Sequence, residues 1–200
     1  MSSESWRHAL VLGGTRSGKS ELAERLLADQ PRVRYVATGL RSATDPEWTR
    51  RIDAHRARRP AGWTTDEVGH DPWRLPPLLA EANPNDVILV DDIGTWVAAV
   101  LTADHPTEPA NRDGPRRATG DPTDRATVRR MSDELGTAVR ACRARLVLVS
   151  AEVGLAPVPL TPVGRAFVDA LGAVNMALAA ACDAAVLVVA GLPVPLKGAL

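Results

Sequence analysis

The chain has few cysteines, no net charge and no long apolar run, and each absence excludes a class of protein. Cys142 and Cys182 are its only cysteines, and their spacing is not CxxC. This excludes a disulfide framework, argues against a structural zinc site and indicates a reducing, cytoplasmic compartment. Lysine plus arginine and aspartate plus glutamate both total 24, so no global field recruits nucleic acid or an acidic membrane.

Targeting and membrane-spanning segments are not expected. The apolar stretch near the N-terminus is short and ends at Gly13, unlike a signal peptide. The alanine- and valine-rich residues 177–190 are interrupted by Asp183, and each half is too short to cross a bilayer. A length of 200 residues with 45% hydrophobic content fits one globular domain, residues 1–200.

Apolar runs alternate along the chain with segments of helical character. We expect buried strands at residues 8–12, 33–38, 87–90, 146–150 and 185–190. We expect helices at residues 19–29, 46–57, 71–82, 94–101, 127–143 and 163–181. This alternation predicts an α/β fold, a mostly parallel central sheet with helices on both faces. Gly191, Pro193 and Pro195 are expected to break the chain after the last strand.

Residues 102–127 differ in composition from the rest of the chain. They contain no Val, Ile, Leu, Met, Phe, Trp or Tyr and are rich in Pro, Gly, Asp and Arg. Such a stretch cannot bury a core, so we expect a polar insertion loop within the domain rather than a linker between domains.

A phosphate-binding loop follows the first expected strand and opens the first expected helix. Its GxxxxGK[ST] residues are Gly13, Gly14, Thr15, Arg16, Ser17, Gly18, Lys19 and Ser20. Glycines let successive backbone N–H groups turn inward, where the helix N-terminus adds partial positive charge. Lys19 is expected to reach the β- and γ-phosphates and Ser20 to bind Mg²⁺. The motif therefore predicts a P-loop NTPase-like fold that binds a nucleoside triphosphate.

Two aspartates end the third expected strand. A P-loop requires an acidic residue there to hold the hydrated Mg²⁺. Asp91 directly follows the apolar run and is our first choice, while Asp92 is an alternative metal ligand or a base for the acceptor hydroxyl. Both residue positions also suit the cap of the following helix.

A histidine lies among arginines on the expected helix at residues 46–57. His55 shares a face with Trp48 and Ile52, a spacing that is typical of a packed structural histidine. Arg50, Arg51, Arg56, Arg58 and Arg59 gather positive charge around it. Arginine forks suit phosphate oxygens, and a neutral imidazole is a competent nucleophile toward phosphorus. Both interpretations of His55 stay open on spacing alone.

Segments spread over most of the chain resemble the bifunctional adenosylcobinamide kinase and adenosylcobinamide-phosphate guanylyltransferase family of cobalamin biosynthesis. They are the P-loop with Arg16-Ser17, Tyr35-Val36-Ala37-Thr38, Arg51-Ile52-x-x-His55, Arg59-Pro60-x-x-Trp63, Glu67, Glu152-Val153-Gly154, Arg165-x-Phe167-x-Asp169-x-x-Gly172-x-x-Asn175, and Val188-Val189-Ala190-Gly191-Leu192-Pro193 with Lys197. This order and spacing are far more specific than the P-loop alone.

The resemblance implies two reactions. A kinase step uses ATP or GTP, with Mg²⁺, to phosphorylate the aminopropanol hydroxyl of adenosylcobinamide. His55 then attacks the α-phosphorus of GTP, expels pyrophosphate and passes GMP to that phosphate, giving adenosylcobinamide-GDP. The resemblance further implies a homotrimer with active sites at subunit boundaries. The residues that it assigns to the guanine nucleotide are Thr38, Arg56, Ala57, Arg58, Arg59 and Glu67.

Two other functions remain as alternatives. The first is a plain P-loop kinase of another small alcohol, in which His55 is structural. The second is a nucleotide-dependent switch, which the sequence disfavours because no guanine-specificity signature of the GTPase type follows the P-loop.

Overall fold

The computed structural model describes the chain except residues 1–5, 40–48, 51, 54–55, 58 and 104–124. Its strands are β1 (His8–Gly13), β2 (Arg34–Ala37), β3 (Thr64–Glu67), β4 (Val87–Asp91), β5 (Arg145–Ala151), β6 (Ala184–Val189) and β7 (Leu192–Lys197). Its helices are α1 (Lys19–Leu26), the 3-10 turn η1 (Pro72–Arg74), α3 (Leu75–Ala80), α4 (Ile93–Thr102), α5 (Arg125–Ala141) and α6 (Pro162–Ala181).

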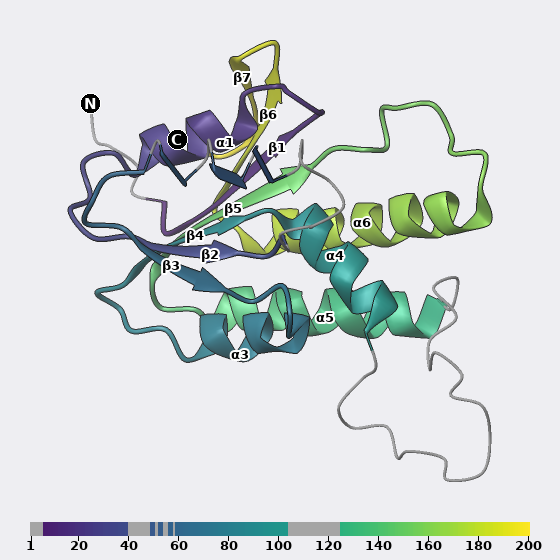
Figure 1. Ribbon diagram of the computed structural model, residues 1–200, viewed down its shortest axis with the longest axis horizontal. Coiled ribbons are helices and arrows are strands. Elements are labelled where there is room, and N and C mark those ends of the chain that lie inside the picture. The colour runs from purple at the N-terminus through teal and green to yellow at the C-terminus, as the bar shows by residue number, and fades with distance from the viewer. Residues whose placement is uncertain (1–5, 40–48, 51, 54–55, 58, 104–124) are drawn as a thin grey trace, which may run out of the picture.

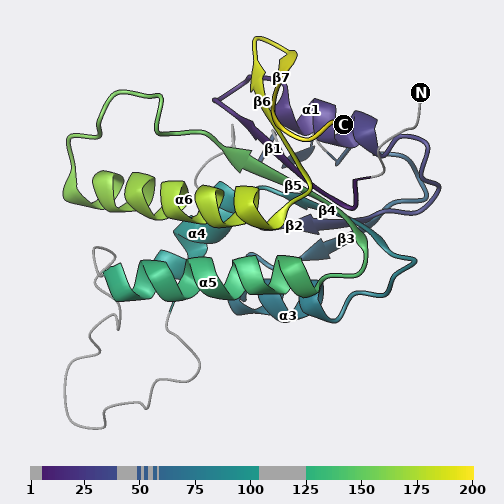
Figure 2. The ribbon, with the colours of Figure 1, turned by 180° about the vertical axis from the view of Figure 1, so that it is seen from behind.

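All the described strands form one seven-stranded sheet in the order β3-β2-β4-β5-β1-β6-β7. Its pairings are parallel except between β6 and β7. Helix α1 covers one face, and α3, α4, α5 and α6 cover the other (Figure 1 and Figure 2). The predicted α/β class, with a mostly parallel sheet and helices on both faces, is confirmed.

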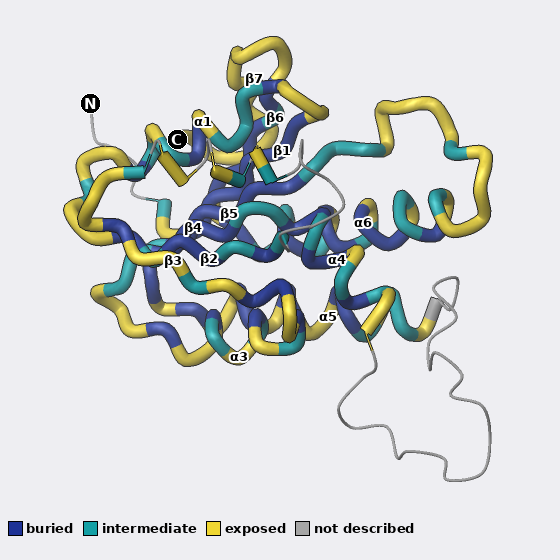
Figure 3. Tube along the Cα trace, viewed as in Figure 1, coloured by how far each residue is buried: buried dark blue, intermediate teal, exposed yellow. Residues whose placement is uncertain are grey.

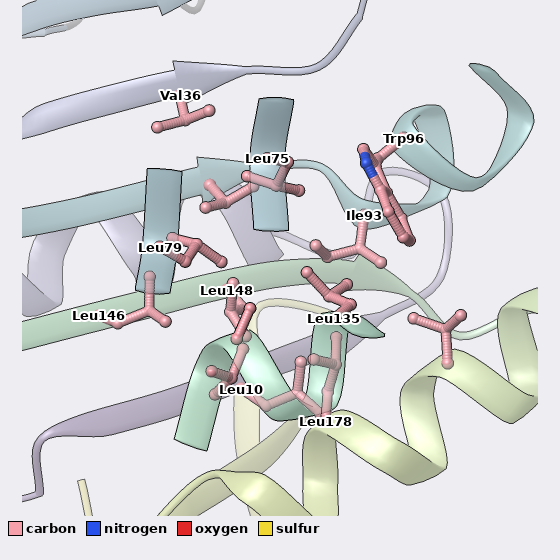
Figure 4. Close-up of a cluster of buried hydrophobic side chains, with 14 of the residues drawn as sticks. Leu10, Val36, Leu75, Leu79, Ile93, Trp96, Leu135, Leu146, Leu148 and Leu178 are labelled. Atoms are coloured by element: carbon pink, nitrogen blue, oxygen red, sulfur yellow. The ribbon is translucent and has the colours of Figure 1, made fainter. Parts of the chain in front are cut away.

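The core lies on both faces of the sheet, because side chains alternate along each strand. In β1, Ala9 and Val11 pack toward α1, whereas Leu10 and Leu12 pack toward the helices of the other face. This double burial explains why the strands are continuous apolar runs. Figure 3 shows the central strands as the most buried part of the chain, and Figure 4 shows Leu10 within the larger cluster.

Helix α6 is long and apolar enough to span a membrane by length and composition. Its apolar face includes Leu171, Val174 and Leu178, which are fully buried in the larger core cluster beside α5. Packing against α5 and the sheet therefore accounts for the buried part of its apolar composition, whereas Val163 and Met176 of the same helix are exposed. Thr161 caps this helix by accepting a hydrogen bond from Gly164 N at 3.1 Å, and Pro162 follows it at the first helical position.

The two strands that the sequence analysis missed lie at the edges of the sheet. Strand β3 is polar and mostly exposed, so it lacks the apolar run that reveals a buried strand. Strand β7 contains Pro193 and Pro195, and our expectation that they break the chain after β6 was wrong. An edge strand tolerates prolines because one side has no partner to bond. Ala190 and Gly191, with φ of 50° and 83°, form the tight turn into β7.

The predicted helices differ from the observed ones mainly at their ends. Helix α1 stops at Leu26 instead of residue 29, and the helix expected at residues 71–82 divides into η1 and α3. The described residues 49–50, 52–53 and 56–57 have helical backbone, as predicted for residues 46–57. Residues 104–124 of the expected insertion loop lie outside the described residues. Its first residue, Thr102, belongs to α4, and residues 125–127 belong to α5.

Candidate active site

The P-loop connects β1 to α1 at the carboxyl end of the parallel strands. A Cβ at Gly13 would lie 2.4 Å from Ser17 Oγ and 2.9 Å from Val188 O, so only glycine fits this position. Gly18 caps α1 with φ of 93°, a conformation that glycine adopts readily. The tight curl of backbone N–H groups that a phosphate requires therefore depends on both glycines.

Neighbouring strands hold the loop from two sides. Ser17 O accepts a hydrogen bond of 2.8 Å from Gly191 N, in the turn between β6 and β7. Gly13 O accepts one of 3.1 Å from Glu152 N, just after β5. The loop is thus fixed through its backbone. The side chains of Thr15 and Arg16 are exposed, whereas Ser17 is buried.

Lys19 and Ser20 open α1, where the P-loop motif requires them. Lys19 Nζ donates to Gly14 O at the long distance of 3.4 Å, so it lies over the loop. Ser20 Oγ donates to Asp91 Oδ1 at 3.2 Å, although the two residues are 71 positions apart. The structure therefore brings the predicted P-loop serine and the predicted acidic strand end into contact.

The two aspartates after β4 have different surroundings. Asp91 reaches the face of the sheet that carries α1, where Ser20 and Tyr35 both donate to its carboxylate. Asp92 caps α4, accepting a hydrogen bond of 2.8 Å from Thr95 N. Burial, together with the nearby negative charge of Asp91, raises the pKa of Asp92. Geometry thus places Asp91 beside the P-loop and gives Asp92 a structural role as a cap.

Thr38 and Glu67 lie at the carboxyl ends of adjacent strands, Thr38 directly after β2 and Glu67 as the last residue of β3. Thr38 is buried, and its hydroxyl donates to Asp92 O at 2.6 Å and contacts the Thr95 hydroxyl. Glu67 is exposed at the end of β3. The hydroxyl of Thr38 is thus engaged inside the protein, while Glu67 faces solvent. A nucleotide contact by either residue stays a prediction.

The arginine-rich helix is described only in part. His55 and Arg58 lie outside the described residues, and Arg56 and Ala57 are exposed. Arg59 places its guanidinium over the Tyr35 ring, 3.2 Å from the centroid, and donates to Thr65 Oγ1 at 3.0 Å. Through Tyr35, the end of this helix is connected to Asp91.

Tyr35 is the functional candidate to which the sequence analysis gave no role. It is 3% exposed, and its hydroxyl donates to Asp91 Oδ2 at 2.8 Å. Burial first, and then the Asp91 charge, raise the pKa of Tyr35, so its hydroxyl stays protonated as a donor. Two signals were available, namely a polar aromatic residue within an apolar run and its place in the Tyr35-Val36-Ala37-Thr38 segment of the family resemblance. Tyr35 and Asp91 come together through the register of β2 against β4. This register cannot be predicted from the sequence.

A separate hollow of about 660 Å³ lies at the opposite, amino end of the strands. Among its lining residues are Trp6, Arg140, Arg143 and Arg145. Helix α5 ends here, and the carbonyl end of a helix favours nearby cations. Arg145 also lies over the Trp6 ring at 4.1 Å. Arg145 is thus engaged in a structural contact, and no predicted site residue lines the hollow.

Comparison with known proteins identifies the family. The model of the family described as cobinamide kinase / cobinamide phosphate guanyltransferase matches residues 9–196. The chain belongs to this family. It is 41% identical over 191 residues to the bifunctional adenosylcobalamin biosynthesis protein CobP of Pseudomonas aeruginosa, covering 94% of this chain and 96% of the relative. It is 40% identical over 194 residues to CobU of Salmonella typhimurium, covering 94% and 98%.

The family resemblance is thus confirmed, and with it the enzyme class, a cobinamide kinase and cobinamide phosphate guanyltransferase. CobU of Escherichia coli is 37% identical over 196 residues, covering 94% of this chain and 98% of that protein. Among solved structures, P4 protein from bacteriophage phi6 in complex with ADP is similar at a TM-score of 0.43 and 14% identity, covering 94% of this chain and 54% of that one.

Proposed function

We propose that the chain phosphorylates adenosylcobinamide at the P-loop and then transfers GMP from GTP to the new phosphate through His55. Family membership supports the pair of activities. The observation that carries the phosphoryl-transfer site is the contact between Ser20 and Asp91 across the P-loop. In the first reaction the substrate hydroxyl oxygen attacks the γ-phosphorus of ATP or GTP, and the nucleoside diphosphate leaves.

The residues beside the P-loop fit a Mg²⁺ ion. No group of three or more His, Cys, Asp or Glu side chains suited to a metal occurs within the described part of the chain. Mg²⁺ does not require one, because it keeps several waters and binds one or two carboxylates plus substrate phosphates. Ser20 and Asp91 would hold the ion, which would neutralise charge on the transferring phosphoryl group.

The chain's own groups position the triphosphate. Backbone N–H groups of the P-loop surround its phosphates, and Lys19 lies over the loop where it can reach the β- and γ-oxygens. Because phosphoryl transfer requires mainly alignment and charge stabilisation, a rigid loop of this kind lowers the barrier without covalent chemistry. Asp92 is engaged as the cap of α4, which supports our assignment of the metal role to Asp91.

The guanylyl transfer proceeds in two displacements. An imidazole nitrogen of His55 attacks the α-phosphorus of GTP and pyrophosphate leaves. A phosphate oxygen of the phosphorylated substrate then attacks the same phosphorus and releases His55. Dividing the step spares the enzyme from aligning GTP and the large corrinoid together. Arg56, Arg58, Arg59, Glu67 and Thr38 are proposed to hold the guanine nucleotide, and the enzyme to act as a cytoplasmic homotrimer.

Labelled GTP tests the covalent step. Incubation with α-labelled GTP and Mg²⁺ should give a protein adduct that is acid-labile and alkali-stable, as expected of a phosphoramidate. His55→Ala should abolish the adduct and GMP transfer while kinase turnover continues. His70→Ala, at an exposed histidine with no proposed role, is the matched control and should keep the adduct.

The same experiment separates the alternatives. A protein that binds GTP and phosphorylates adenosylcobinamide but never forms the adduct contradicts the histidine mechanism. A protein that phosphorylates another small alcohol in preference to adenosylcobinamide supports the plain-kinase alternative, with His55 structural.

A further inference from the structure

The Asp91 carboxylate is held by a separate donor at each oxygen. Ser20 Oγ donates to Oδ1 at 3.2 Å from the start of α1. Tyr35 OH donates to Oδ2 at 2.8 Å from β2. Ala37 and Asp91 are register partners on neighbouring strands, and Tyr35 lies two residues before Ala37 on the same face. The phenol therefore reaches Asp91 from the neighbouring strand.

The Tyr35 ring is itself fixed on two sides. Its surroundings include Leu22 of α1 and Leu89 of β4 in the smaller core cluster. The Arg59 guanidinium lies over the ring at 3.2 Å, and Thr65 accepts a hydrogen bond from this guanidinium. A cation over an aromatic face is attracted by the ring's quadrupole. The hydroxyl is thus aimed at Asp91 by a ring with little freedom to move.

We propose that Tyr35 is a positioning residue for the kinase step, whose hydroxyl fixes the orientation of the Asp91 carboxylate beside the P-loop. The last side-chain torsion of aspartate is broad, so each donor bonded to the carboxylate narrows its range of orientations. Tyr35 is one such donor, and it acts on Oδ2. The proposal rests on the proposed function, because it takes Asp91 to be the carboxylate that holds Mg²⁺.

A purely structural role makes a different prediction. A buried phenol needs a partner, and Asp91 would satisfy it whether or not a metal binds. Deleting the hydroxyl would then change the thermal midpoint alone. A positioning role requires a change in metal dependence as well, because hydrogen-bond partners of metal ligands typically affect metal affinity or activity about 10- to 100-fold.

Tyr35→Phe tests the hydroxyl alone, since the ring and its contact with Arg59 are retained. We expect the Mg²⁺ concentration for half-maximal kinase rate, at saturating nucleotide, to rise about tenfold or more. Excess Mg²⁺ should restore much of the rate. Ser132→Ala is the matched control, because it removes another buried hydroxyl, bonded to Val128 O within α5, and should leave Mg²⁺ dependence unchanged. An unchanged Mg²⁺ dependence in Tyr35→Phe overturns the proposal.

If Tyr35→Phe does not fold, a measurement on the unaltered protein tests whether the Tyr35 hydroxyl responds to Mg²⁺. Tyr35 is the chain's single tyrosine, so labelling tyrosine with ¹³C at the carbon that bears the hydroxyl gives one NMR signal. This signal should shift between a non-hydrolysable ATP analogue with EDTA and the same analogue with Mg²⁺. An identical signal in both conditions overturns the proposal.

The variant Asp91→Asn distinguishes failure of the Tyr35 proposal from failure of the metal role proposed for Asp91. Normal Mg²⁺ dependence in Asp91→Asn would remove Asp91 from the metal site and so overturn both its proposed metal role and the role of Tyr35. Altered dependence in Asp91→Asn, with normal dependence in Tyr35→Phe, overturns the role of Tyr35 alone. Altered dependence in both variants supports both proposals.

Discussion

The chain has two lysines, and they lie at opposite ends of the sheet. Within the described part of the chain, Lys19, at the carboxyl end, donates one long hydrogen bond, of 3.4 Å, to Gly14 O. Lys197, at the amino end, donates to Ala179 O, Ala180 O and Cys182 O at 2.9, 3.3 and 2.6 Å. The second ammonium is saturated by the end of α6, whereas the first is held loosely beside a phosphate-binding loop.

The contrast extends to the acidic residues. At the amino end, Asp183 accepts hydrogen bonds of 2.9 Å from the backbone N–H groups of Arg7 and His8, which fixes the starts of two neighbouring strands. At the carboxyl end, Asp91 is held by the side chains of Ser20 and Tyr35. We infer that polar groups at the amino end stabilise the fold and those at the carboxyl end serve the reaction. Substitutions at the amino end should therefore change the stability of the fold, and substitutions at the carboxyl end should change the kinase rate.

Lys19→Ala should produce the largest effect. Removing one preorganised donor to transition-state charge typically costs about 10²- to 10³-fold in rate, so kcat of the kinase should fall by about that factor. The thermal midpoint should change little, because the only described bond of Lys19 is long. Steady-state kinetics and calorimetry on the same preparation check both statements. Kinase kinetics equal to those of the unaltered protein would refute the role of Lys19.

The same isosteric change, aspartate to asparagine, should affect kinase activity differently at Asp91 and at Asp92. Asp91→Asn should lower kinase activity by about 10- to 100-fold and raise the Mg²⁺ concentration needed for half-maximal rate, because the charged ligand is lost. Asp92→Asn keeps a capping oxygen for Thr95 N, and Asn caps helices as well as Asp, so it should retain most activity. Titrating Mg²⁺ in kinase assays of both variants tests this order. A larger loss in Asp92→Asn would transfer the metal role to Asp92.

Lys197→Met should affect stability rather than activity. The variant keeps an apolar side chain of similar length but leaves the last carbonyls of α6 without their charged donor. Hydrogen bonds to a charged group contribute about 1.5 to 3 kcal/mol, so the free energy of unfolding should fall by about that amount. Urea unfolding measures it, and kinase activity at 15 °C serves as the control. A strong loss of activity with unchanged stability would break the comparison between the two ends.

The sequence revealed the carboxyl end of the sheet better than the amino end. The P-loop and the acidic end of β4 are local patterns with fixed chemistry, so Ser20 and Asp91 were predicted and lie in contact. Tyr35 and Lys197 act through strand register and an edge hairpin, which join residues far apart in the chain. Strand β7 was missed because its prolines are tolerated only at an edge, and a single sequence does not say which strand is the edge.

The smallest expected effect is the pH dependence conferred by Asp183. The hydrogen bond from His8 N, followed by that from Arg7 N, lowers the pKa of the Asp183 carboxyl below its ordinary value. A lowered pKa means that the stabilisation is present above the ordinary carboxyl pKa and is lost as pH falls through the folded-state value. Because the group is largely exposed, we expect a contribution of less than about 1 kcal/mol.

Asp183→Asn isolates this contribution because asparagine keeps an acceptor oxygen but does not titrate. The unaltered protein should be slightly more stable than the variant near pH 7, and the difference should shrink as pH falls below about 4. Comparing the two proteins at each pH cancels the opposite trend from Asp92, whose raised pKa makes stability fall as pH rises. Urea unfolding from pH 3 to pH 7 measures the difference. A constant difference across that range would show that Asp183 acts through geometry alone, without its charge.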